Sequence, residues 1–157
     1  MPADRDFMQM ALEEARAATL EQEVPVGAVL VHDGQVLARK HNRMVRNKDP
    51  LAHAELLALR TAIALHPDKW LLDSTLYVTL EPCTMCAGAL VLARVKRLVF
   101  ATPDPKAGAC GSVSNIVQSS ILNHRVEVES GLFQQEAADL LTTFFRELRN
   151  KAGNPKS

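Results

Sequence analysis

The sequence predicts a single α/β domain, a three-layer α/β/α sandwich around a mixed sheet of about five strands. Helix-type and strand-type segments alternate along the 157 residues, a pattern that places helices on both faces of a sheet. The first two strand-type segments are separated by an Asp-Gly turn, so they pair antiparallel and make the sheet mixed. The length corresponds to one domain over residues 1–157, with 151–157 expected as a frayed tail.

The first half of the chain is expected to begin with a helix. Ala, Leu, Met and Glu, all strong helix formers, are dense over 6–20. Two short apolar runs, 24–31 and 36–40, follow on either side of the Asp-Gly turn and predict a hairpin. The polar stretch 41–51, which contains Asp49-Pro50, predicts a loop, and the proline sets the start of a helix over 52–65.

The second half repeats the alternation of strand and helix. Residues 74–80 alternate as a strand does, and Pro82 opens a helix over 83–93 because proline is tolerated in a first turn. The remaining elements are a strand over 96–102, a Gly- and Ala-rich loop over 103–114, a short helix over 116–121, a strand over 125–129 and an amphipathic helix over 133–149.

Composition excludes several classes of protein. Apolar residues make up 47% and charged residues 23% of the chain, as in an ordinary globular domain, and no apolar run is long enough for a membrane span. The 18 basic and 18 acidic residues balance, which argues mildly against a nucleic-acid-binding domain. The N-terminus lacks the apolar core of a signal peptide, and three cysteines are an odd number, so we expect reduced thiols and a cytoplasmic location.

Two short segments contain the residue types of a metal site. One is His53-Ala54-Glu55, and the other is Glu81-Pro-Cys83-Thr-Met-Cys86. Cysteines three apart share one face of a helix, and a helix N-terminus stabilises thiolates. Zinc prefers thiolate and imidazole ligands, so His53 is the natural third ligand. Glu55 is a candidate for general acid–base work beside the metal, provided that the site caps the helix end.

Other interpretations of these residues remain open at this point. A bare CxxC pair is also typical of a redox dithiol. A structural zinc site needs four protein ligands, and Cys110 or His124 are available as a fourth. A catalytic site keeps three ligands and an open position, which the presence of Glu55 favours.

The combination of H-x-E with P-C-x-x-C resembles the zinc-dependent nucleoside and nucleobase deaminases, which have a cytidine deaminase-like fold. More narrowly, the chain is similar to the bacterial tRNA-specific adenosine deaminases. The similarity covers nearly the whole chain through the blocks 23–31, 49–55, 76–88 and 122–127 and the closing pair Phe144-Phe145.

The resemblance implies hydrolytic deamination of adenosine to inosine at the wobble position of tRNA, by a homodimer that holds one Zn²⁺ per subunit and binds the anticodon loop. It implies that His53, Cys83 and Cys86 hold zinc and that Glu55 moves protons. It also implies substrate contacts by Asn42 to the flipped nucleotide, by the Ala54 backbone to the base edge, by Asp104 to a neighbouring nucleotide, by Asn123 to a sugar or phosphate, and by Phe145 near the pocket.

The chain departs from the family pattern at Pro103, Pro105 and Leu148, which lie where RNA would be contacted outside the pocket. Five basic residues and no acidic one occur between Arg39 and Lys48, next to Asn42, and such a rim suits a phosphate backbone. Without the resemblance, Asn42, Asn123 and Asp104 are ordinary turn residues. The alternatives are a deaminase of a free nucleobase or nucleoside (cytosine, guanine or cytidine) and a structural-zinc binding module without turnover.

Overall fold

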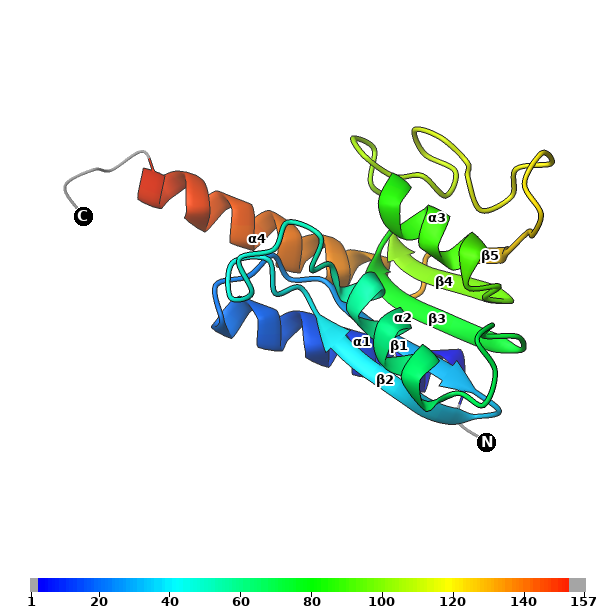
Figure 1. The fold of residues 1–157 in the computed structure, drawn as a ribbon. Helices are drawn as coiled ribbons and strands as arrows, with labels where there is room; N and C mark the ends of the chain where they lie inside the picture. The colour runs from blue at the N-terminus through cyan, green and yellow to red at the C-terminus, as the bar shows by residue number, and fades with distance from the viewer. Residues whose placement is uncertain (1–2, 153–157) are drawn as a thin grey trace.

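The computed structural model describes residues 3–152, which form one sheet with helices on both sides (Figure 1). The elements in chain order are α1 (Asp4–Leu20), β1 (Gly27–His32), β2 (Gln35–His41), α2 (Ala54–Leu65), β3 (Ser74–Leu80), α3 (Thr84–Leu92), β4 (Arg97–Thr102), β5 (Glu127–Ser130) and α4 (Gln134–Ala152). None of the helices in this part of the chain has the length and apolarity that crossing a membrane requires.

The sheet has five strands in the order β2-β1-β3-β4-β5, and it is mixed as predicted. β1 runs antiparallel to both β2 and β3, whereas β3, β4 and β5 are mutually parallel neighbours. The hairpin turn has positive φ at Asp33 (51°) and Gly34 (74°), the backbone that Asp-Gly favours. β1 begins at Gly27, later than expected, because Pro25 has no N–H to give to a ladder.

Side chains of the central strands alternate between two cores. Ala28 and Leu30 of β1 pack in a cluster with residues of α2 and α3, while Val29 and Val31 pack in a second cluster with α1. In Figure 1, α2 and α3 cover one face of the sheet, and α1 and α4 lie on the other. The predicted three-layer α/β/α sandwich is therefore confirmed.

In the second half of the chain, two predicted elements differ most from the observed ones. Residues 116–121 form turns and no helix, because Asn115 Oδ1 accepts from the Gln118 amide (3.3 Å) and Ser119 Oγ from the Ile121 amide (3.4 Å). The last helix continues to Ala152, since no Gly or Pro interrupts it, so 151 and 152 are not a frayed tail. The rest of that predicted tail, 153–157, lies outside the described residues.

Candidate metal and catalytic site

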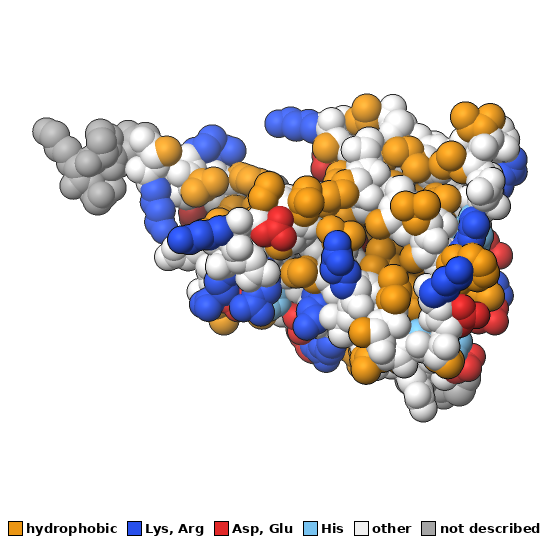
Figure 2. All heavy atoms as spheres, in the orientation of Figure 1, with side chains coloured by type: hydrophobic (Ala, Val, Ile, Leu, Met, Phe, Trp, Pro, Cys, Tyr) orange, Lys and Arg blue, Asp and Glu red, His pale blue; other side chains and the backbone are white. Residues whose placement is uncertain are grey.

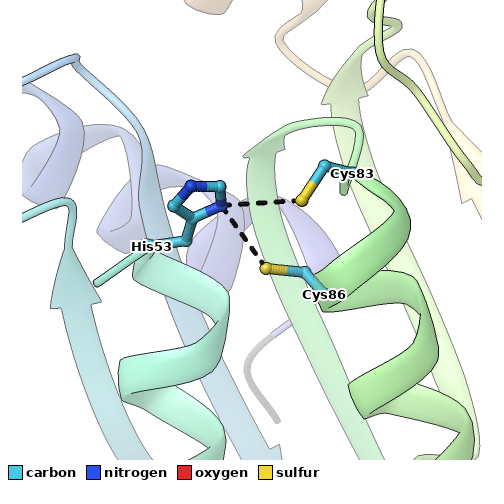
Figure 3. Close-up of side chains that lie close together, drawn as sticks. All are labelled: His53, Cys83 and Cys86. Carbon is cyan, nitrogen blue, oxygen red and sulfur yellow. Dashed lines mark hydrogen bonds between the residues drawn. The ribbon is translucent and has the colours of Figure 1, made fainter. Parts of the chain in front are cut away.

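The three predicted metal ligands come together at the beginnings of two neighbouring helices. His53 is the N-cap of α2, Cys83 is the N-cap of α3, and Cys86 lies in the first turn of α3. Figure 3 shows both sulfur atoms directed toward the imidazole ring. Helix α2 therefore begins two residues later than predicted. The two positive helix ends meet at this point, which favours anionic ligands there.

The separations of the ligand atoms fit a zinc ion. His53 Nδ1 lies 3.6 Å from Cys83 Sγ and 3.6 Å from Cys86 Sγ. A tetrahedral zinc with bonds of about 2.0 Å to nitrogen and about 2.3 Å to sulfur separates such atoms by about 3.5 Å. These three residues are the group of potential metal ligands found within residues 3–152, and their ligand atoms all lie within 4.8 Å of one another.

Neither residue considered as a fourth ligand joins this group. Cys110 Sγ faces the Pro82 carbonyl at 3.9 Å, and His124 Nε2 faces the Val95 carbonyl at 2.6 Å. All three cysteines are free thiols. The group could therefore offer three ligands to a metal ion, and a site with three protein ligands leaves a coordination position open for chemistry.

The thiols of the pair differ in their ionisation. The neighbouring Cys86 thiol and the imidazole of His53 stabilise the Cys83 thiolate and lower the pKa of Cys83 to about 3. The hydrogen bond between the two cysteines keeps the proton on Cys86 and, together with burial, raises the pKa of Cys86. The pair therefore presents one thiolate before any metal adds its own charge, which prepares the site for a cation.

Glu55 lies beside the ligand group in a buried position. Its side chain is 4% exposed, and burial raises the pKa of Glu55 to about 7. Residues two apart on an ideal helix point in different directions, but this does not keep His53 and Glu55 from facing the same centre. His53 precedes the helix with an extended backbone (φ −76°, ψ 149°), so it and Glu55 can face one centre.

Asn42 sits at the N-terminus of α2, next to the metal group. It is buried, and its Oδ1 accepts a hydrogen bond from the Ala54 amide at 2.7 Å. Asn42 thus caps the helix that carries Glu55, a role that its position in the loop sequence did not reveal. Asn42 and Ala54 are both placed at the site.

The buried acid Glu23 holds the loop over 42–53, a role that was not predicted from the sequence. Glu23 is 1% exposed, and its carboxylate accepts the amides of Val45 (3.1 Å) and Arg46 (2.8 Å). The sequence offers one indication of this role, because Glu23 is an acid next to an otherwise apolar strand segment.

The basic rim predicted over 39–48 is partly neutralised by α1. Arg39 pairs with Glu13 (3.0 Å) and with Glu14 (3.2 Å), and Arg46 pairs with Glu21 (3.3 Å). The other three basic residues of this segment, Lys40, Arg43 and Lys48, form no ion pair within residues 3–152.

Asp104 and Phe145 lie on one groove of about 640 Å³ between α4 and the loop after β4. The groove also includes Leu80 and Thr102, the last residues of β3 and β4, so it adjoins the sheet edge from which Cys83 follows. In Figure 2, hydrophobic side chains cluster where α4 packs against the rest of the domain, and Lys and Arg side chains flank them. Pro103, Pro105 and Leu148, the departures from the family pattern, line this groove too.

Asn123 is not brought to the metal group. It is exposed and precedes β5, which begins beside Arg97, the first residue of β4. The candidate ligand Cys83 instead follows the far end of β3, which pairs with the last residue of β4. The six residues of β4 span about 20 Å at about 3.3 Å each, so the two places lie about a strand length apart.

Comparison with known proteins agrees with this geometry. A family model described as MafB19-like deaminase matches residues 3–149. A tRNA-specific adenosine deaminase of Bacillus subtilis (strain 168) is 46% identical over 151 residues, covering 96% of this chain and 94% of the relative. The chain belongs to the tRNA-specific adenosine deaminase family. A further member, from Aquifex aeolicus (strain VF5), is 46% identical and covers 92% of this chain and 95% of its own.

Solved structures with a similar fold belong to proteins that act on different substrates. A structure from a study of A-to-I editing by tRNA:A34 deaminases at the wobble position superposes with a TM-score of 0.83 at 46% identity, over 86% of this chain and 98% of its own. A guanine deaminase from Nitrosomonas europaea superposes with a TM-score of 0.79 at 27% identity, over 92% and 85%. The chain is therefore an enzyme of the deaminase class with the cytidine deaminase-like fold.

Proposed function

We propose that this protein hydrolyses the wobble adenosine of a tRNA anticodon loop to inosine, with release of ammonia, in a single catalytic domain. The observation that carries the proposal is the three-ligand group of His53, Cys83 and Cys86 beside the buried Glu55. The 46% identity to tRNA-specific adenosine deaminases supports the choice of substrate. The absence of a fourth ligand from this group among residues 3–152 argues against a structural-zinc module.

His53, Cys83 and Cys86 would hold one zinc ion per subunit, and that ion would supply the Lewis acidity that makes water a nucleophile near neutral pH. The Glu55 carboxylate takes a proton from the attacking water and delivers it to N1 of the adenine. Glu55 then carries the proton of the added hydroxyl to the exocyclic nitrogen, which leaves C6 as ammonia. Adenosine and water thus give inosine and ammonia, with Glu55 returned to its starting state.

The positions of Asn42, Ala54, Asp104 and Phe145 support the proposed substrate contacts. The Asn42 amide and the Ala54 backbone flank the metal group and contact the flipped nucleotide and the base edge. Asp104 and Phe145 hold neighbouring anticodon-loop nucleotides in the groove, because a single-stranded loop offers unstacked bases to such a surface. Asn123 contacts a sugar or phosphate away from the metal group of its own subunit.

The test is a substrate panel given to the zinc-loaded protein, with ammonia release as the measurement. The panel contains an anticodon stem-loop with adenosine at the wobble position, the same stem-loop with guanosine there, cytidine, guanine and free adenosine. We expect ammonia from the adenosine stem-loop alone. Release from guanine or cytidine alone would instead assign the protein to free-base or nucleoside deamination, and no release from any member would favour a binding module.

We propose that the active form is a homodimer joined through the face formed by α2 and α3. Ile63, Trp70 and Leu92 expose 38%, 39% and 78% of their surfaces there, around an apolar depression of about 310 Å³. Figure 2 shows hydrophobic side chains on this face. A second copy would bury them, because apolar patches of this kind mark protein interfaces.

Sedimentation velocity tests the dimer. Leu92→Glu should give a monomer, whereas Leu20→Glu, at a leucine on α1 that is also largely exposed, should leave the dimer intact. Equal sedimentation of both variants and the original chain would refute this interface. We also propose a cytoplasmic location, supported by the three free thiols and by a tRNA substrate.

A further inference from the structure

A further buried carboxylate that the deamination scheme does not use lies between the segment of Cys83 and Cys86 and the loop over 103–114. Glu81 directly follows β3 and is two residues before Cys83. Its side chain is only 2% exposed. No ion pair within residues 3–152 involves it. A buried charge is costly unless hydrogen bonds replace its water, so the donors around Glu81 determine why it is there.

All the donors found around Glu81 come from the loop. Oε1 accepts from the Asp104 amide at 3.0 Å and from the Ser112 hydroxyl, and Oε2 accepts from the Cys110 amide at 3.0 Å and the Ser112 amide at 3.1 Å. Burial opposes the charged form, yet these four bonds lower the pKa of Glu81 below its ordinary value. The carboxylate thus binds residues near both ends of the loop.

The loop closes around the carboxylate without space to spare. A Cβ on Gly108 would overlap the Glu81 carboxylate, so a larger residue at that position would displace the carboxylate. The Ala109 amide donates to the Pro82 carbonyl at 2.9 Å, which ties the loop to the residue before the ligand Cys83. The loop is therefore docked on the metal-ligand segment by side chain and backbone together.

The docked loop also forms one wall of the groove, through Pro103, Asp104 and Lys106. We propose that Glu81 is a positioning residue for the reaction, which fixes the Asp104 wall of the groove relative to the metal ligands and so sets binding of the nucleotide beside the target adenosine. This inference rests on the proposed function. Glu81 itself does not contact the substrate in this proposal, because all four hydrogen bonds that it accepts come from the protein.

Glu81→Gln tests the inference because a carboxamide has one acceptor atom where the carboxylate has two. With its oxygen facing the Cys110 and Ser112 amides, its NH₂ group can donate to the Ser112 hydroxyl but cannot accept from the Asp104 amide. The variant therefore releases the Asp104 backbone selectively. We expect zinc content and kcat within about threefold of the original, and a KM for the adenosine stem-loop about tenfold higher, equal to about 1.4 kcal/mol.

Two readouts separate this inference from the proposed function. Hydrogen exchange at the Asp104 amide should be faster in Glu81→Gln than in the original protein, whatever the substrate proves to be. Glu127→Gln, the same change at an exposed acid of β5, should alter neither exchange at Asp104 nor KM. If the unaltered protein fails to deaminate the stem-loop, the proposed function is refuted, while exchange still measures the anchor.

Two outcomes would overturn the positioning role. One is faster exchange at Asp104 with an unchanged KM, and the other is loss of zinc together with kcat, which would make Glu81 a support of the metal segment. Should Glu81→Gln not fold, Ser112→Ala removes the hydroxyl donor alone and leaves three bonds in place. We expect that variant to raise KM about threefold at unchanged kcat, and an unchanged KM would overturn the proposal.

Discussion

Two regions at opposite edges of the sheet, one where β4 begins and one where β3 ends, hold carboxylates in opposite ways. At the edge where β4 begins, Asp4 is bound by Arg97 through two hydrogen bonds of 2.8 and 2.6 Å and by the Tyr77 hydroxyl at 2.6 Å. At the edge where β3 ends, Glu55 is buried and takes part in no ion pair found within residues 3–152.

The two carboxylates ionise accordingly. The hydrogen bonds from Arg97 lower the pKa of Asp4 to about 2, whereas burial raises the pKa of Glu55 to about 7. A paired carboxylate stabilises the fold and cannot readily take a proton. An unpaired buried carboxylate destabilises the fold but can exchange protons near neutral pH. We call the edge at Asp4 the structural edge and the edge at Glu55 the reactive edge.

Removing a metal ligand is the most severe test of the reactive edge. Cys83→Ser should abolish zinc binding and lower kcat/KM for the stem-loop by about a thousandfold or more, because metal assistance contributes several kcal/mol. Cys110→Ala, at a buried thiol outside the ligand group, should retain one zinc per chain by elemental analysis. Equal zinc loss in both variants would mean that the thiols act through folding rather than as ligands.

The unpaired cations beside the reactive edge predict a smaller effect. Lys48 is exposed next to the Asn42 loop, and Lys48→Gln should raise KM for the stem-loop about fivefold, close to 1 kcal/mol, and flatten its salt dependence. Lys96→Gln, beside Asp73 at the other edge, serves as the control. A salt slope that is identical in the two variants would show that Lys48 contacts no phosphate.

The structural edge predicts the smallest change, in stability alone. Asp4→Asn should lower the free energy of unfolding by about 1 kcal/mol at pH 7, a value reduced by the partial exposure of the pair. Because the pKa of Asp4 is lowered, its contribution is present above the ordinary value of 3.8 and fades as the pH falls toward about 2. Urea unfolding at pH 7 and pH 3 should show the difference shrinking, and a difference that grows on acidification would contradict the pairing.

The sequence allowed the fold class and the grouping of His53, Cys83 and Cys86 to be predicted because both depend on local patterns. The alternation of apolar runs determines the layers, and the spacing of Cys83 and Cys86 determines a shared face. It did not reveal Glu81 or the capping role of Asn42, since each acts on residues that the fold brings close from elsewhere in the chain. The helix expected over 116–121 was wrong because side-chain hydrogen bonds to the backbone outweighed propensity there.

The central claim is that Glu55 moves the protons at the reactive edge. The most direct measurement is single-turnover formation of inosine in the stem-loop by Glu55→Gln and by the unaltered chain, with zinc per chain measured on the same samples. The account predicts equal zinc and a rate at least about a hundredfold lower in the variant, the scale of lost general acid–base catalysis. A zinc-replete variant with a rate within about threefold of the original would contradict it.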